Sequence, residues 1–328
     1  MNAKENYLRM LRGEMPEFMP SFFEPYMAPV KEELLTPQTA PDGPIITSFG
    51  VTYIGNAENN WGAMPDPRIH ILEDITKWRD IIKAPDISGR DWESYYKKKT
   101  ENIDRENLCV MIDGGDFFLT LASFMGFENA LLAMHEEPEE VTELFEYVSQ
   151  FYMAVLRNQM YYMRPEVYVL MDDDSAYQAP FFSVDMYRRL IKPFHRRQCD
   201  IAHEFGAIVE RHDCGKSEQF IDDWLDIGVR EWNPAQISND LKAVKRKYTG
   251  RLALSGCWDS QGPLSNKSVD DKTLKDALAE YTDTFAPGGG FTFGAMIGGP
   301  PDDPEANEKR EVIKNFFFDY ARNWYSTH

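Results

Sequence analysis

The sequence predicts a single (β/α)8 barrel over residues 1–328, of the α/β class, with an N-terminal extension and a long excursion after the first strand. From about residue 108 onward, short apolar runs alternate with amphipathic segments, which is the pattern of parallel βαβ units. About eight apolar runs favour a closed barrel over an open sheet. A length of 328 residues is ordinary for one such domain.

The N-terminal part supplies the extension and the excursion. Residues 3–12 have the pattern of a short amphipathic helix that ends at Gly13, and Phe22-Phe23-Glu24 is predicted as the first strand. Residues 25–67 are rich in Pro, Gly and Asn, so we expect mostly loop there. Further elements expected before residue 108 are a strand over 48–54 and helices over 70–83 and 91–106.

The rest of the chain follows the alternation of strand and helix. Pro138, with Glu139 and Glu140 behind it, is a typical start for a long helix, and Gly206 and Gly228 are typical ends. Strands are expected at 108–112, 166–171, 207–216, 229–232, 252–257 and 291–293. Helices are expected at 118–134, 138–163, 184–205, 217–227, 239–248, 268–284 and 304–325.

Composition excludes several classes of function. The net charge of −19 repels polyanions, so nucleic acid is not an expected partner. No apolar run approaches the roughly 18 residues of a membrane span. The first residues lack a signal-peptide pattern and the four cysteines lack the density of a disulfide framework, so a cytoplasmic protein with reduced thiols is expected.

A pair of potential metal ligands stands in the segment from Ala207 to Lys216. Side chains of a strand alternate between its faces, so Glu210, His212 and Cys214 are expected on one face. An imidazole and a thiolate two residues apart suit zinc. The alternative is a hydrogen-bonded interior histidine beside a small buried cysteine.

Other polar side chains are expected near this pair, because barrel enzymes keep their reactive groups at the C-terminal ends of the strands. At those ends stand Asp113, Asp116, Asp172, Asp173, Asp174, Glu231, Cys257 and Asp259. Alternation makes Asp172 and Asp174 partners on one face and leaves Asp173 on the other. We expect at least one of these three to contact the substrate; Tyr26, Trp61 and Trp258 are further candidates for lining the mouth, unless they belong to an aromatic core.

Four motifs in order resemble the uroporphyrinogen decarboxylase superfamily over nearly the whole chain. They are the opening residues 4–13 followed by Met19-Pro20, Phe124-Met-Gly-Phe-Glu128, the segment 171–187 with Ile191-Lys-Pro193, and His212-Asp-Cys-Gly215. The last motif is similar to the form found in the zinc-dependent, corrinoid-linked methyltransferase branch. The resemblance therefore implies a barrel fold and a Zn2+ site at His212 and Cys214.

The sequence departs from both branches of that superfamily. The decarboxylase carries an arginine-rich loop after its first strand and a histidine in its last strand, whereas residues 23–28 here contain no arginine and residues 291–297 no histidine. The methyltransferase branch takes a third zinc ligand, a cysteine, from that last strand, and it is missing here. Cys257, or Glu210, is expected to complete the set of ligands.

The resemblance implies methyl transfer between a small methylated compound, such as a methoxylated aromatic, and a corrinoid (cobalamin) cofactor on a partner protein. Asp172 and Asp174 are the expected catalytic acids, and Asp113, Asp173, Tyr26, Trp61 and Trp258 are expected to bind substrate. Transfer to a thiol acceptor is the reverse direction, which the sequence leaves open. Two rivals are a metal-free decarboxylase that uses an aspartate such as Asp172, and a non-catalytic binding barrel. A homodimer is compatible with the sequence.

Overall fold

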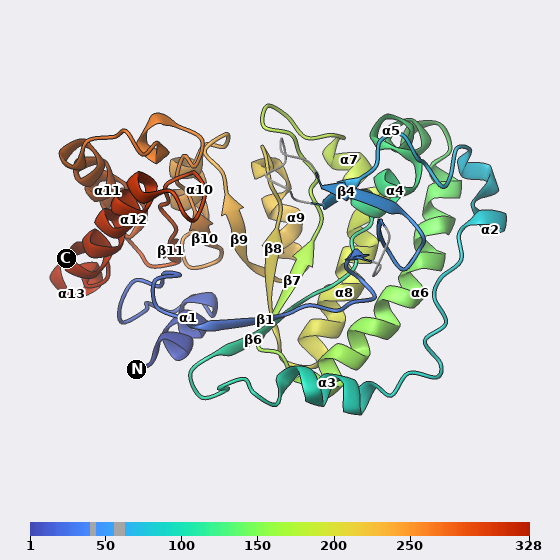
Figure 1. Cartoon of the computed structure of the whole chain (residues 1–328), viewed down its shortest axis with the longest axis horizontal. Helices are drawn as coiled ribbons and strands as arrows, with labels where there is room; N and C mark the ends of the chain where they lie inside the picture. The colour runs from blue at the N-terminus through green and yellow to red at the C-terminus, as the bar shows by residue number, and fades with distance from the viewer. Residues whose placement is uncertain (40–43, 56–62) are drawn as a thin grey trace.

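The computed structural model describes residues 1–39, 44–55 and 63–328 and has an α/β fold built on one large parallel sheet (Figure 1). In the described residues this sheet has seven strands in the order β1-β6-β7-β8-β9-β10-β11, each parallel to its neighbour. It curls into a half-barrel with the major helices outside it. The strands are β1 (Met27–Val30), β6 (Cys109–Asp113), β7 (Val167–Met171), β8 (Ile208–His212), β9 (Val229–Ala235), β10 (Ala253–Gly256) and β11 (Phe291–Phe293).

The predicted first strand at residues 22–24 is wrong. The backbone N–H of Glu24 donates to the carbonyl of Ser21, so these residues form a turn, while Ser21 itself makes an isolated parallel bridge with Phe293 of β11. The ring of Phe23 packs against Phe293, which explains why the run is aromatic. The chain thus touches the last strand at Ser21 before β1 pairs with β6.

The strand predicted over residues 48–54 exists only in part and lies in a different sheet. A four-stranded antiparallel sheet contains β2 (Gln38–Thr39), β3 (Ile45–Ile46), β4 (Thr52–Gly55) and β5 (Ala63–Pro65). Figure 1 shows β4 beside helices α4 and α5, away from the first helix. The count of eight strands in one closed barrel is therefore not reproduced in the described residues. The excursion after the first strand thus forms a small sheet of its own, where mostly loop was expected.

The helices follow the predicted order with shifted ends. They are α1 (Ala3–Leu11), α2 (Trp78–Ile81), α3 (Trp92–Thr100), α4 (Phe118–Met125), α5 (Phe127–Glu136), α6 (Pro138–Met163), α7 (Val184–Met186), α8 (Lys192–Glu204), α9 (Ile221–Asp226), α10 (Leu241–Tyr248), α11 (Asp271–Phe285), α12 (Pro304–Phe316) and α13 (Trp324–Thr327). The helix predicted over 118–134 breaks at Gly126, which has a φ of 81°. A Cβ at Gly126 would lie 2.6 Å from the imidazole of His70, so a side chain there would clash.

The core has a large and a small part. The large part fills the space between the sheet and the helices, and α6 contributes a continuous buried stripe that includes Val141, Leu144 and Val148. The small part lies where α1 packs against the beginning of β1 and β6 and contains Tyr7, Tyr26 and other apolar residues. Among the described residues, no helix is long and apolar enough to cross a membrane.

Candidate functional site

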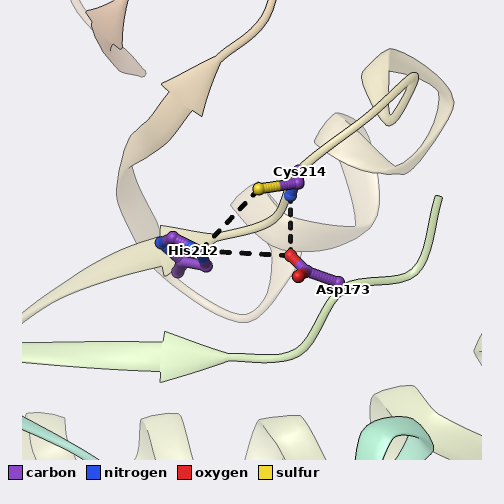
Figure 2. Close-up of side chains that lie close together, drawn as sticks. All are labelled: Asp173, His212 and Cys214. Carbon is purple, nitrogen blue, oxygen red and sulfur yellow. Dashed lines mark hydrogen bonds and ion pairs between the residues drawn. The ribbon is translucent and has the colours of Figure 1, made fainter. Parts of the chain in front are cut away.

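Three potential metal ligands meet at the ends of two adjacent strands. β7 and β8 are parallel and pair Met171 with His212, which places Asp173, just after β7, beside His212 and Cys214. Nε2 of His212 lies 3.9 Å from Sγ of Cys214 and 4.0 Å from Oδ1 of Asp173. Figure 2 shows the three side chains facing a common point. In the described part of the chain, this is the one group of three such residues close enough to hold a metal ion.

Without a cation, this cluster favours uncharged forms of its nitrogen and sulfur groups. Burial lowers the pKa of His212, and the nearby carboxylate of Asp173 offsets this only in part. Burial, followed by the charge of Asp173, raises the pKa of the Cys214 thiol to about 12. A divalent cation would reverse the second effect, because metal binding stabilises the thiolate. The cluster therefore has the donor atoms for a metal, although it lacks the positive charge that would ionise its cysteine.

Behind the cluster lies a buried ion network centred on Arg211. The guanidinium of Arg211 contacts Asp174 at 2.5 Å and Asp213 at 2.9 Å, and all three side chains are fully buried. Burial raises the pKa of Asp174, and it raises that of Asp213 to about 7. Alternation correctly places Arg211 and Asp213 opposite His212. However, Asp174 belongs to this network and is not exposed at the mouth, where it was predicted as an acid.

Asp172 is also turned away from the mouth. Its carboxylate accepts hydrogen bonds of 3.0 Å from the backbone N–H groups of Phe117, Phe118 and Leu119, at the start of α4. It also lies 3.3 Å from Nε2 of the buried His195. Burial opposes ionisation, but the hydrogen bond from His195 and the helix-start amides outweigh it and lower the pKa of Asp172. The structure thus places an ionised helix anchor where the sequence predicted a proton donor.

Glu210 does not join the metal cluster. Its carboxylate accepts a 3.0 Å hydrogen bond from Nδ2 of Asn233 and lies 3.5 Å from the hydroxyl of Tyr7. The same hydroxyl donates to Glu231, which also accepts from Thr292. Burial raises the pKa of Glu210 to about 7 and that of Glu231 to about 8. Glu210 shares a face with His212, but two residues earlier on the strand it lies deeper in the sheet's interior.

Cys257 also stays outside the cluster. It is buried, its backbone has a φ of 58°, and burial raises the pKa of its thiol. The charged group that acts on this thiol is Lys245. The neighbouring Trp258 donates a 2.7 Å hydrogen bond from Nε1 to Ser265 and lines a separate hollow of about 410 Å³. The structure therefore does not bring Cys257 to His212 and Cys214 as the sequence predicted.

The other residues predicted to bind substrate lie in different parts of the structure or outside the residues it describes. Tyr26 is buried beneath α1, with its ring centroid 4.3 Å from that of Tyr7, so it is a core residue and does not line the mouth. Asp113 forms an ion pair with Lys31, and both act electrostatically on His212, so Asp113 does lie near the cluster. Trp61 lies outside the described residues.

A pocket of about 790 Å³ opens beside the cluster. Asp173 lines it together with Asp116, whose Oδ1 accepts a 2.7 Å hydrogen bond from Thr120. Burial, and then the charge of Asp172, raises the pKa of Asp116 to about 7. The other lining residues come mainly from β4, β5, α4 and α5, and include Tyr53, Met64, Pro65, Leu119, Ser123 and Phe127. Sequence reasoning placed Asp116 at a strand end but did not single it out.

A solved structure of a known protein resembles this chain as a whole. It is described as a methyltransferase from Methanosarcina mazei and superposes with a TM-score of 0.60 at 14% sequence identity. The alignment covers 98% of this chain and 100% of that one, so the two proteins share their fold over their full lengths. No match was found among curated proteins.

The sequence itself matches one protein family. The model described as uroporphyrinogen decarboxylase (URO-D) matches residues 117–312, which is more than half of the chain. This range contains β7, β8 and all three residues of the metal cluster. It also contains three of the four motifs that suggested the superfamily in the sequence. The chain belongs to the uroporphyrinogen decarboxylase family.

Proposed function

We propose that this protein is a zinc-dependent methyltransferase that moves a methyl group from a small methylated compound to a corrinoid cofactor on a partner protein. The observation that carries the proposal is the position of the metal cluster. Asp173 belongs both to the cluster and to the lining of the 790 Å³ pocket, so a molecule in the pocket would lie beside a bound ion. The fold shared with a methyltransferase supports the proposal.

The residues present fit zinc. Ligands of a tetrahedral zinc ion lie roughly 3.4 to 3.6 Å apart, given its usual bond lengths to nitrogen, oxygen and sulfur. The observed separations of 3.9 and 4.0 Å need only a small contraction to reach that range. His212, Cys214 and Asp173 would thus supply three ligands, which leaves a fourth position for a substrate atom. A zinc ion held by these three residues would act as a Lewis acid on that substrate atom.

Asp116 is the proposed proton donor in place of Asp172. When a methyl–oxygen bond breaks and the methyl group passes to the reduced corrinoid, the bonding electrons stay on the oxygen, which must take up a proton. Asp116 lines the same pocket as Asp173 and has a pKa of about 7, so a large fraction holds a proton at neutral pH. Asp172 has the opposite property, because its carboxyl is held ionised.

The lining of the pocket argues against a porphyrin decarboxylase. Among its described residues there is no lysine or arginine to bind the propionate groups of a uroporphyrinogen. The charged groups that do line it are mostly carboxyls, including Asp66, Asp116, Glu128 and Asp173. Tyr53, Leu119 and Phe127 add apolar surface suited to a flat ring. A methoxylated aromatic compound without several acid groups matches this lining better.

The decisive experiment combines metal analysis with a transfer assay. Purified protein is expected to hold about one zinc per chain, and to methylate free reduced cobalamin when given a panel of methoxylated aromatics. Demethylated product and methylcobalamin should appear in equal amounts. Carbon dioxide release from a carboxylated substrate, with no methylcobalamin from any donor, would refute the proposal. A protein that contains no metal after careful preparation, and that takes up none, would refute its zinc component.

A further inference from the structure

Another hollow lies at the opposite end of the sheet from the metal cluster. It has a volume of about 460 Å³ and lies against the beginnings of β8 and β9. Its lining consists of Leu11, Arg12, His203, Ala207, Ile208, Val209, Gly228 and Arg230. Ile208 and His212 are four residues apart on β8, which corresponds to roughly 13 Å along a strand. The hollow is therefore distinct from the pocket beside Asp173.

The charged side chains of this hollow all belong to basic residues. Arg12, His203 and Arg230 are exposed, and no described residue lining the hollow is acidic. Within the described part of the chain, none of these three side chains forms a hydrogen bond or ion pair. Two basic residues nearby do have partners, since Arg9 pairs with Glu14 and Arg157 with Glu204. Two arginines and a histidine thus face one hollow without a counter-charge in a protein of net charge −19.

Close packing at two glycines constrains the ring of His203 and the backbone beside Arg12. Gly228 has a φ of 91°, and a Cβ on it would overlap the imidazole of His203, so the ring packs directly on the glycine. Gly13, next to Arg12, has a φ of 82°, and a Cβ there would lie 2.5 Å from the carbonyl oxygen of Gly250. The chain beside Arg12 therefore makes a close backbone contact with the turn before β10.

Helix dipoles explain only part of this arrangement. Arg12 and His203 lie at the C-terminal ends of α1 and α8, where positive charge offsets the negative end of the dipole. Arg230 has no such role, because it lies on β9. Its side chain points outward, as alternation with the buried Glu231 requires. Arg230 therefore offsets neither a helix dipole nor a counter-charge, and it shares the hollow with two other basic side chains.

We propose that this hollow binds a small phosphate-bearing molecule. A guanidinium presents two parallel N–H donors that match two oxygens of a phosphate, and two arginines can hold a dianion from two sides. A volume of 460 Å³ exceeds the needs of a single inorganic phosphate and lies in the range of ligand pockets. The class of ligand is therefore a phosphorylated metabolite of about nucleotide size, held mainly by Arg12 and Arg230.

Calorimetric titration of the full-length protein with ADP and with inorganic phosphate tests this proposal. ADP should bind at one site per chain, more tightly than inorganic phosphate, and more weakly as salt increases. Arg12→Gln and Arg230→Gln should each weaken ADP binding by roughly tenfold or more, the usual cost of losing a charge-assisted contact. Arg246→Gln is the matched control, since Arg246 lies on α10 outside the hollow, is exposed, and forms no hydrogen bond or ion pair within the described part of the chain.

Two results would overturn the proposal. One is the absence of ADP binding to wild-type protein at low salt. The other is an equal loss in all three arginine variants, which would indicate general attraction of anions to the surface. His212→Ala should leave ADP binding unchanged, so this test is independent of the proposed zinc site. Because none of the three arginines is buried or paired, their variants should keep the melting temperature of the wild type, which a thermal scan checks.

Discussion

The backbone N–H of Cys214 donates a 2.8 Å hydrogen bond to Oδ1 of Asp173 and so joins the loop after β8 to the loop after β7. This bond holds the carboxylate against the two neighbouring side chains of the cluster, with Oδ1 4.0 Å from Nε2 of His212. The three donor atoms for a metal ion are therefore already close together, within 4.8 Å of one another. Little reorganisation of the loops would be needed on binding.

His212→Ala and Cys214→Ser are each expected to remove zinc while the protein stays folded. His212 ends β8 with a side chain that is 33% exposed, and Cys214 lies just beyond the strand and is half-buried. Neither belongs to the core, so their loss leaves the packing of the sheet intact. Zinc content measured by atomic spectrometry and circular dichroism checks both parts. Cys199→Ser is a control, because Cys199 is buried on α8 away from the cluster. Full zinc content in both cluster variants would contradict the site.

Two variants distinguish Asp173 from Cys257 as the third zinc ligand. Asp173→Asn keeps an oxygen that can accept from the N–H of Cys214 but removes the charge, so it should weaken zinc binding by roughly tenfold or more. Cys257→Ala should leave zinc affinity unchanged, because its thiol faces Lys245. Competition with a chromogenic chelator measures both affinities. The opposite pattern would restore the ligand set predicted from the sequence.

Asp116→Asn is expected to slow demethylation of a methoxylated substrate by roughly 10²- to 10⁴-fold, the range for loss of a general acid. Zinc content should remain at the wild-type level, since Asp116 is not part of the metal cluster. The rate is measured as formation of methylcobalamin from free reduced cobalamin. An Asp116→Asn variant with the wild-type rate would remove Asp116 from the mechanism.

Asp172→Asn is expected to destabilise the protein by about 2 kcal/mol or more, because three backbone amides of α4 and His195 lose a charged acceptor. The folded-state pKa of Asp172 is lowered, so its contribution to stability is present above the unfolded value and is lost as the pH falls through the folded value. Urea unfolding at neutral pH measures the loss. A change below a few tenths of a kcal/mol would contradict the role of helix anchor.

Glu231→Gln is expected to make the protein relatively more stable at alkaline pH. The folded pKa of Glu231 is about 8 and the unfolded value about 4.3, so the stability contributed by the protonated carboxyl is full below about pH 4.3, falls as the pH rises toward 8, and is lost above 8. Glutamine cannot ionise and can still bond to Tyr7 and Thr292. Between about pH 6 and pH 9, wild type should lose roughly 2 kcal/mol more than the variant. Unfolding measured at both pH values checks this. An equal loss in the free energy of unfolding for wild type and variant would refute the prediction.

Most of the fold was predictable because its strongest signals are local. Of the six strands from β6 onward, β6, β7, β10 and β11 are short, largely apolar runs, while β8 and β9 mix apolar and charged residues between glycines that end helices; each was predicted within a few residues. The first strand was missed because Met27–Val30 contains Pro29, which cannot donate to the ladder and so weakens the pattern of a strand. The nearby aromatic Phe22 and Phe23 gave a stronger apolar signal, although their segment is a turn.

The site was predicted less well than the fold, since its geometry depends on depth and on loops. Alternation put His212 and Cys214 on one face, and their side chains do lie close together, although β8 ends at His212. The same rule placed Asp173 apart from its neighbours, but β7 ends at Met171, and the loops beyond both strands set the positions of Asp173 and Cys214. The role of Asp172 depends on α4, more than 50 residues earlier in the chain, which no local pattern reveals.

The large pocket has walls from two separate parts of the chain. One wall comes from β4 and β5 of the small antiparallel sheet, and the other from α4 and α5, whereas the metal cluster stands on the loops after β7 and β8. Under the proposed function, substrate selectivity and chemistry would therefore be encoded in different segments of the chain. Exchange of the small sheet for another sequence would change which compounds fit the pocket and leave the metal cluster unaltered. Replacement of this one insertion during evolution would change the substrate in the same way.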